Sequence, residues 1–120
     1  MGMVELLHEL GHVLIGGVFL WVGIGHFLKF GAVTSQLKES GFPAPGPMLA
    51  AGSTLEIVAG FCLAIGLART YAALALLAFT VAASLLALNF WRYDGATRQT
   101  MKSGFLINIA VAGGLMLAAT

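Results

Sequence analysis

Four long apolar runs alternate with short polar segments along the chain. The runs cover residues 12–30, 47–68, 71–91 and 103–119. A helix needs about 20 mostly apolar residues to cross the hydrocarbon core of a bilayer, and each run is close to that length. The pattern therefore predicts an all-α fold, in which residues 1–120 form a single transmembrane domain, a bundle of four membrane-spanning helices.

The segments between the runs determine how the spans connect. Residues 31–46 begin with polar residues that predict a short helix and end in a Gly- and Pro-rich turn, which cannot continue it. Only Arg69 and Thr70 separate the second run from the third, so these two spans are predicted to be antiparallel neighbours. Residues 92–102 are polar and contain an Asp-Gly turn signal. Because the number of crossings is even, both termini lie on one side of the membrane, side B, and the two longer connections lie on the other, side A.

Composition supports a membrane location. The chain is 59% hydrophobic and 9% charged, with a mean hydropathy of +0.95. A typical soluble domain has about a quarter of its residues charged, so lipid is the solvent that suits this chain. Membrane lipids are therefore its first expected partner. The net charge is +1 and no basic stripe with interleaved aromatic residues occurs, which argues against a nucleic-acid partner. The single cysteine, Cys62, lies in an apolar run and is expected to be a small packing residue.

The basic residues are distributed unequally between the two sides. Side B has only Arg69, whereas side A has Lys29, Lys38, Arg92, Arg98 and Lys102. Cytoplasmic loops carry an excess of Lys and Arg, so the distribution predicts a multi-pass protein of the cell membrane whose connections 31–46 and 92–102 are cytoplasmic. Both termini would then lie outside.

Small residues recur on one face of several runs and predict close helix packing. In the second run, Gly52, Gly60 and Ala64 are separated by multiples of four residues, which places them on one helix face. Gly23 in the first run and Gly113 in the fourth are expected to have the same role. Such smooth stripes let the backbone of another helix approach closely.

Polar side chains inside the apolar runs are the candidates for chemistry. An ionisable group in the hydrocarbon core costs about 2.5 kcal/mol or more, so each one needs an explanation. Glu56 lies near the middle of the second run, and His26 lies near the side A end of the first. Asn89 and Asn108 also lie close to side A ends. These four side chains, one from each run, are predicted to converge in a polar pocket that opens toward side A.

Two interpretations of this pocket remain open. In the first, the pocket binds a polar headgroup, such as a quinone carbonyl or a lipid headgroup, with Glu56 protonated or paired with His26. In the second, the four groups satisfy one another and fix the register of the helices. Hydrogen bonds of that kind contribute about 0.6 kcal/mol each on average.

The segment 8–12, HELGH, matches the HExxH motif of zinc proteases, some of which lie within membranes. The motif places two histidines on one helix face for zinc, but a catalytic zinc needs a third protein ligand. Asp94 lies on the opposite side of the membrane and Glu56 lies at mid-depth. The chain is also short for the surrounding helices of such a protease. We therefore expect His8 and His12 to form an interfacial pair without a metal, and a zinc intramembrane protease is the most remote hypothesis.

Several short segments, taken together in order and spacing, resemble the DoxX family of four-helix membrane proteins. The segments are residues 19–30, 41–47, 56–60, 66–69 and 89–91, and Asn108 with residues 113–115. The resemblance implies an association with membrane redox systems, because the family name comes from a subunit of a thiosulfate:quinone oxidoreductase and other members are linked to quinone metabolism. This chain departs from the family at Leu88, where a His is frequent, and at Ile107, where a Lys is frequent. Both losses favour an accessory role over catalysis.

The sequence contains no Gly-rich phosphate loop, no paired catalytic carboxylates and no nucleophile with a neighbouring base. An autonomous enzyme is therefore not expected. The leading hypothesis is an accessory or structural subunit that packs against other subunits, or against itself, in a larger quinone-linked redox complex. The alternative is a quinone-binding oxidoreductase subunit that uses His26, Glu56, Asn89 and Asn108. No covalently bound cofactor is expected, and quinone is the candidate ligand.

Overall fold

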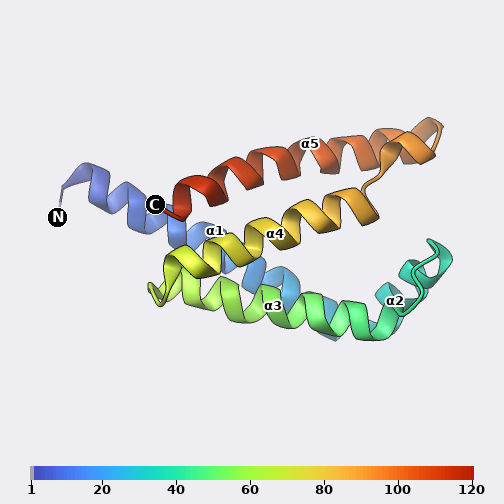
Figure 1. Cartoon of the computed structure of the whole chain (residues 1–120), viewed down its shortest axis with the longest axis horizontal. Coiled ribbons are helices and arrows are strands. Elements are labelled where there is room, and N and C mark those ends of the chain that lie inside the picture. Colours follow the sequence, from blue (N-terminus) through green and yellow to red (C-terminus); the bar gives the residue numbers. More distant parts are fainter. Residues whose placement is uncertain (1) are drawn as a thin grey trace.

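The structure, a computed structural model, describes residues 2–120 and is all-α (Figure 1). Its elements are the helices α1 (Met3–Leu28), α2 (Phe30–Glu39), α3 (Pro45–Ile65), α4 (Arg69–Ala87) and α5 (Gly95–Ala118), with a short 3₁₀ helix η1 (Phe90–Arg92) before α5. Within the described residues, four helical segments are long and apolar enough to cross a membrane: α1, α3, α4 together with η1, and α5. The predicted fold class is confirmed.

The helices extend beyond the apolar runs at two places. Helix α1 begins at Met3 rather than at residue 12, and α5 begins at Gly95 rather than at residue 103. Residues 3–11 of α1 are apolar apart from Glu5, His8 and Glu9, and the first turns of α5 are polar, and both segments continue their helices beyond the predicted runs. The chain leaves α1 at Lys29, whose φ of −115° and ψ of 33° break the helix and start α2.

The link between α3 and α4 differs from the sequence prediction. It consists of residues 66–68, and Arg69 already belongs to α4. Gly66 adopts φ +87°, a conformation in which a side chain would be strained, and it ends α3 as an αL cap. The N–H groups of Gly66 and Leu67 both donate to the carbonyl of Cys62, at 3.0 and 2.9 Å. The predicted antiparallel arrangement follows from this tight turn.

Helices α1 and α3 approach each other most closely at two glycines. A Cβ atom at Gly60 would lie 2.7 Å from the carbonyl oxygen of Gly16, and a Cβ at Gly16 would lie 2.7 Å from the backbone nitrogen of Ala64. A Cβ at Gly23 would lie 2.8 Å from the side chain of Ile57. Any larger residue at these glycines would separate the two backbones, so the small residues determine the distance between the helices.

Two other predicted packing glycines have different surroundings. Gly52 faces α4, where an added Cβ would lie 2.9 Å from the ring of Phe79. Gly113 was predicted to pack against another helix, but no atom of the described residues lies within 4 Å of a Cβ added there. Its neighbour Gly114 points inward instead and would contact Ile15 at 3.6 Å. Successive residues of a helix differ by about 100° in direction, so Gly114 faces the bundle while its neighbour Gly113 faces away from it.

The tightly packed core lies toward side B, the end that holds both termini and the α3–α4 link. Leu63, Leu76 and Leu115, from three different helices, have no exposed surface. Toward side A, α4 and α5 diverge from α1 and α3, and α2 lies beside the start of α3 (Figure 1). The core cluster does not include the predicted polar residues His26, Glu56, Asn89 and Asn108, and each of them lines one of the cavities described below.

Candidate functional site

The candidate site is built around a hydrogen-bonded pair of ionisable side chains, one from α1 and one from α3. His26 Nδ1 donates to Glu56 Oε1 across 3.0 Å. Glu56 is 3% exposed, and no other side chain among residues 2–120 hydrogen-bonds to it. Gly23 lies one turn before His26, and its missing side chain allows α1 to lie close to Glu56, since an added Cβ would be 3.1 Å from the Glu56 Cβ. The absence of a side chain at Gly23 therefore lets His26 and Glu56 come within hydrogen-bonding distance.

A cavity of about 280 Å³, called here the pair cavity, adjoins this ion pair. His26, Ser53 and Glu56 form its polar wall, and the rest is apolar, with Leu49, Phe79 and Leu86 among the lining residues. Ser53 is 1% exposed, and its hydroxyl has no hydrogen-bond partner within the described part of the chain. An unpartnered buried hydroxyl is costly, so the Ser53 hydroxyl is a polar group of this wall that still lacks a hydrogen-bond partner.

Asn108 lies in a different place. Its Nδ2 donates to Ser84 Oγ across 3.0 Å, and Ser84 Oγ donates to the carbonyl of Thr80 across 2.7 Å. These residues line a cavity of about 110 Å³ between α4 and α5, the α4–α5 cavity, which neither His26 nor Glu56 contacts. The divergence of α5 from α1 and α3 keeps Asn108 away from the ion pair.

Asn89 is also separate from the ion pair. It follows α4 directly, is 8% exposed, and its Nδ2 lies 3.4 Å from the carbonyl of Leu86. It lines a third cavity of about 190 Å³, the side A cavity, together with Arg92 and Tyr93. The predicted convergence of four polar groups is therefore wrong: His26 and Glu56 meet, and each asparagine lies in a cavity of its own. Depth in the membrane, on which the prediction was based, does not specify which way a helix face points.

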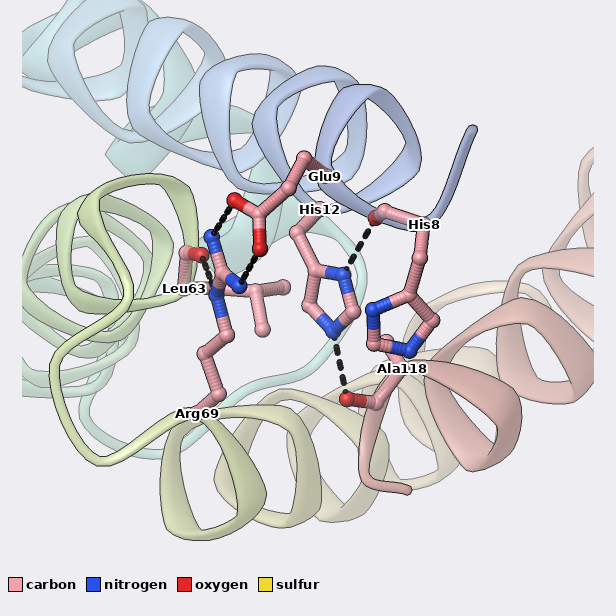
Figure 2. A network of polar contacts seen from close by, with 6 residues as sticks. All are labelled: His8, Glu9, His12, Leu63, Arg69 and Ala118. Carbon is pink, nitrogen blue, oxygen red and sulfur yellow. Dashed lines mark hydrogen bonds and ion pairs between the residues drawn. The ribbon is translucent and has the colours of Figure 1, made fainter. Parts of the chain in front are cut away.

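The HExxH segment takes part in a structural network at side B (Figure 2). Arg69 Nη1 and Nη2 donate to Glu9 Oε1 and Oε2 at 2.7 and 2.8 Å, a bidentate ion pair between α1 and the start of α4. Arg69 Nε also donates to the carbonyl of Leu63 across 3.1 Å and so satisfies one of the last carbonyls of α3. Both carboxylate oxygens of Glu9, the glutamate of the motif, therefore accept hydrogen bonds from Arg69.

His12 connects α1 to the end of α5. Its Nδ1 lies 2.6 Å from the carbonyl oxygen of His8, and its Nε2 lies 2.7 Å from that of Ala118 (Figure 2). Carbonyl oxygens only accept hydrogen bonds, so both ring nitrogens donate when the imidazole carries two protons, and one donates otherwise. No group of three metal-ligating His, Cys, Asp or Glu side chains occurs in residues 2–120. The motif binds helices together here, and the two ring nitrogens of His12 are not free for zinc.

Sequence reasoning missed Ser53 and the pairing of Arg69 with Glu9. Ser53 precedes Glu56 by three positions in the sequence, so the two share a helix face, and this spacing is the signal that could have revealed it. In the sequence, Arg69 stands out only as the basic residue of a link. Its partner Glu9 is distant in sequence, and only the packing of α1 against α3 brings the two together.

The four long apolar helices define a multi-pass integral membrane protein with four candidate spans. The family model of DoxX matches residues 10–89, and the chain belongs to the DoxX family. The matched region holds α2, α3, α4 and most of α1, with His26, Glu56 and Asn89, whereas Asn108 on α5 lies outside it. No curated protein and no solved structure matches the chain.

Proposed function

We propose that this DoxX protein binds the headgroup of a quinone in the pair cavity, as a subunit of a larger quinone-linked membrane redox complex. The observation that carries the proposal is the contact between the buried Glu56 and His26, whose side chain is 32% exposed, in the wall of an otherwise apolar cavity. Ionisable groups in membrane spans usually mark ligand or proton pathways. A purely structural ion pair would need no cavity beside it.

The cavity suits the chemistry of a quinone headgroup. A quinone has two carbonyl oxygens that accept hydrogen bonds, on a flat apolar ring. The Ser53 hydroxyl and a protonated His26–Glu56 pair can donate to a carbonyl, while Phe79 and Leu49 provide apolar contacts for the ring. The volume of about 280 Å³ is near the lower end of small-molecule sites, which suits a headgroup whose tail extends into lipid.

The residues of this chain bind and orient, and they can hold a proton beside the ligand. Bound quinone would supply the redox chemistry, because none of the side chains in the pair cavity carries electrons. A source of electrons must therefore lie in a partner, which is why the proposal places the chain in a larger complex. The expected orientation, with the connections 31–46 and 92–102 in the cytoplasm, is part of this proposal.

The second candidate is an accessory subunit that binds no quinone. The observation in its favour is the α4–α5 cavity, where Ser84 and Asn108 form a hydrogen-bonded pair between α4 and α5, the least buried of the four spans. A membrane helix of another subunit could cover this region, since polar side chains contribute to helix association in lipid. This role would leave the His26–Glu56 pair purely structural.

Quinone binding separates the two candidates. The full chain in lipid nanodiscs is titrated with a short-chain benzoquinone and, separately, with a naphthoquinone, and binding is followed by quenching of tryptophan fluorescence. Glu56→Gln should weaken binding about tenfold or more, the loss expected for one charge-assisted hydrogen bond. Glu39→Gln, an exposed acid on α2, is the matched control and should bind as the original chain does. Equal binding by both variants would favour the accessory role.

A further inference from the structure

The side A cavity has a different character from the pair cavity. It encloses about 190 Å³ between α2, the end of α4, η1 and α5, at the level where the spans end. Gln36, Asn89, Arg92 and Tyr93 provide hydrogen-bond donors in its lining. Neither Glu39 nor Asp94, the two acidic residues of this end, lines it. A cavity with several donors and a single full positive charge suits an anion.

Arg92 has a guanidinium group available for such a ligand. Among residues 2–120, the two ion pairs are His26–Glu56 and Arg69–Glu9, and neither involves Arg92. Arg69 shows the contrast, because both of its terminal nitrogens are occupied by Glu9. The planar guanidinium matches the oxygens of a phosphate in a bidentate manner.

The side A cavity adjoins the pair cavity along an apolar wall. Leu37, Phe42, Leu86 and Ala87 line both of them. A ligand whose polar end lies near Arg92 would therefore have a continuous apolar surface for a hydrocarbon chain. Trp91 and Tyr93 beside the cavity are residue types that concentrate at the membrane–water interface, which places the polar end at headgroup level.

From this geometry we infer that the side A cavity binds the phosphate group of an anionic phospholipid. Arg92 contacts the phosphate, Gln36 and Tyr93 donate further hydrogen bonds, and one acyl chain follows the shared apolar wall. A free phosphate ion would use the same donors but would gain nothing from Leu37 and Phe42. The phosphate site does not depend on quinone binding, because His26 and Glu56 do not line this cavity, whereas the acyl chain would share the apolar wall with the pair cavity.

Native mass spectrometry of the full chain tests the inference. The protein is purified in mild detergent and supplied with either phosphatidylglycerol or phosphatidylcholine. The original chain should retain phosphatidylglycerol in preference to phosphatidylcholine, and Arg92→Gln should lower that retention about tenfold, as expected for a hydrogen bond to a charged group. Gln36→Ala, on a separate element, should lower it by a smaller factor.

Arg98→Gln is the matched control. Arg98 lies at the same end of the molecule with its guanidinium 5.5 Å from the centroid of the Phe90 ring, and it does not line the cavity. Its replacement should change retention by less than about twofold, because only a screened, distant charge is lost. Equal losses from Arg92→Gln and Arg98→Gln would indicate diffuse attraction to the basic end and would overturn the inference, as would equal retention of the two lipids.

Inorganic phosphate distinguishes a lipid from a soluble anion. Retention of phosphatidylglycerol in millimolar phosphate supports a lipid site, whereas its complete displacement would identify a free anion as the ligand and overturn the lipid assignment. Circular dichroism of Arg92→Gln checks that the helices are intact. If that variant does not fold, Gln36→Ala provides the test instead, and unchanged lipid retention in it would contradict the inference.

Discussion

The carbonyl oxygen of Ala118 lies 2.7 Å from Nε2 of His12, so a buried side chain of α1 satisfies one of the last carbonyls of α5. The C-terminal end of a helix has free carbonyls and a partial negative charge, and a histidine N–H is a suitable partner for both reasons. The hydrogen bond between Asn108 and Ser84 joins α5 to α4, and the His12 contact joins the end of α5 to α1.

Replacing His12 with Ala should therefore destabilise the protein. The change leaves the Ala118 carbonyl without its donor and a small void at a buried position, a combined loss of about 1–3 kcal/mol. His8→Ala is the control, because His8 is exposed and its side chain should contribute less than about 0.5 kcal/mol. Thermal unfolding in detergent, followed by circular dichroism, measures both. Equal midpoints for the two variants would show that the His12 contact contributes nothing.

The same histidine leads to a prediction about metal. Since both nitrogens of His12 contact carbonyl oxygens and Glu9 is bound by Arg69, the purified protein should contain no stoichiometric zinc. Treatment with a chelator should leave the unfolding midpoint unchanged. Elemental analysis that found one zinc per chain, lost on His8→Ala, would restore the protease hypothesis.

The bidentate contact between Arg69 and Glu9 should depend on geometry as well as charge. Arg69→Lys retains the positive charge but loses the planar fork and the hydrogen bond to the Leu63 carbonyl, so its unfolding midpoint should fall below that of the original chain. Arg69→Ala should fall further. Because the Glu9 side chain is 45% exposed, high salt should narrow the difference in unfolding midpoint between the original chain and Arg69→Lys. Identical midpoints for Lys and Arg at low salt would contradict the geometric role.

The two glycine environments provide a matched comparison. Gly60→Ala forces a Cβ against the backbone of Gly16 and should destabilise the chain by about 1–3 kcal/mol, the usual cost of overpacking. Gly113→Ala adds a methyl group in open space within a helix and should be neutral or stabilising by up to about 1 kcal/mol. Unfolding by a denaturing detergent gives both values. If Gly113→Ala were the more harmful change, Gly113 would face a partner that covers α5 in the native membrane.

Hydropathy was sufficient to predict the four spans and their antiparallel order, because apolar length is a physical requirement of the bilayer. It did not identify the helix ends, since the polar residues Glu5, His8 and Glu9 interrupt the apolar pattern at the start of α1, and the first turns of α5 are polar, yet both segments are helical. Hydropathy placed the link between α3 and α4 at Arg69 and Thr70, whereas the link consists of residues 66–68. The helix ends there because Gly66 adopts the αL conformation, a local backbone property that hydropathy does not report.

The candidate site was predictable in part. The depth of Glu56 and His26 in their spans indicated that each needs a partner, and the structure pairs them at 3.0 Å. The sequence predicted how far along their spans Asn89 and Asn108 lie, but not toward which neighbouring helix their side chains point. Side-chain direction changes by about 100° per helical residue, and the divergence of α5 depends on tertiary packing. The cavities depend on which helices diverge, and no periodicity in the sequence reports that.

The central claim is that the pair cavity binds a quinone headgroup, and photolabelling tests it most directly. The full chain in nanodiscs is irradiated with an azido-quinone, and labelled peptides are identified by mass spectrometry, with Glu56→Gln as the comparison. We expect the label on residues that line the pair cavity, with Phe79 and Leu86 foremost, and a loss of that label in Glu56→Gln. A label spread over lipid-facing residues such as Trp21, and equal in both proteins, would contradict the claim.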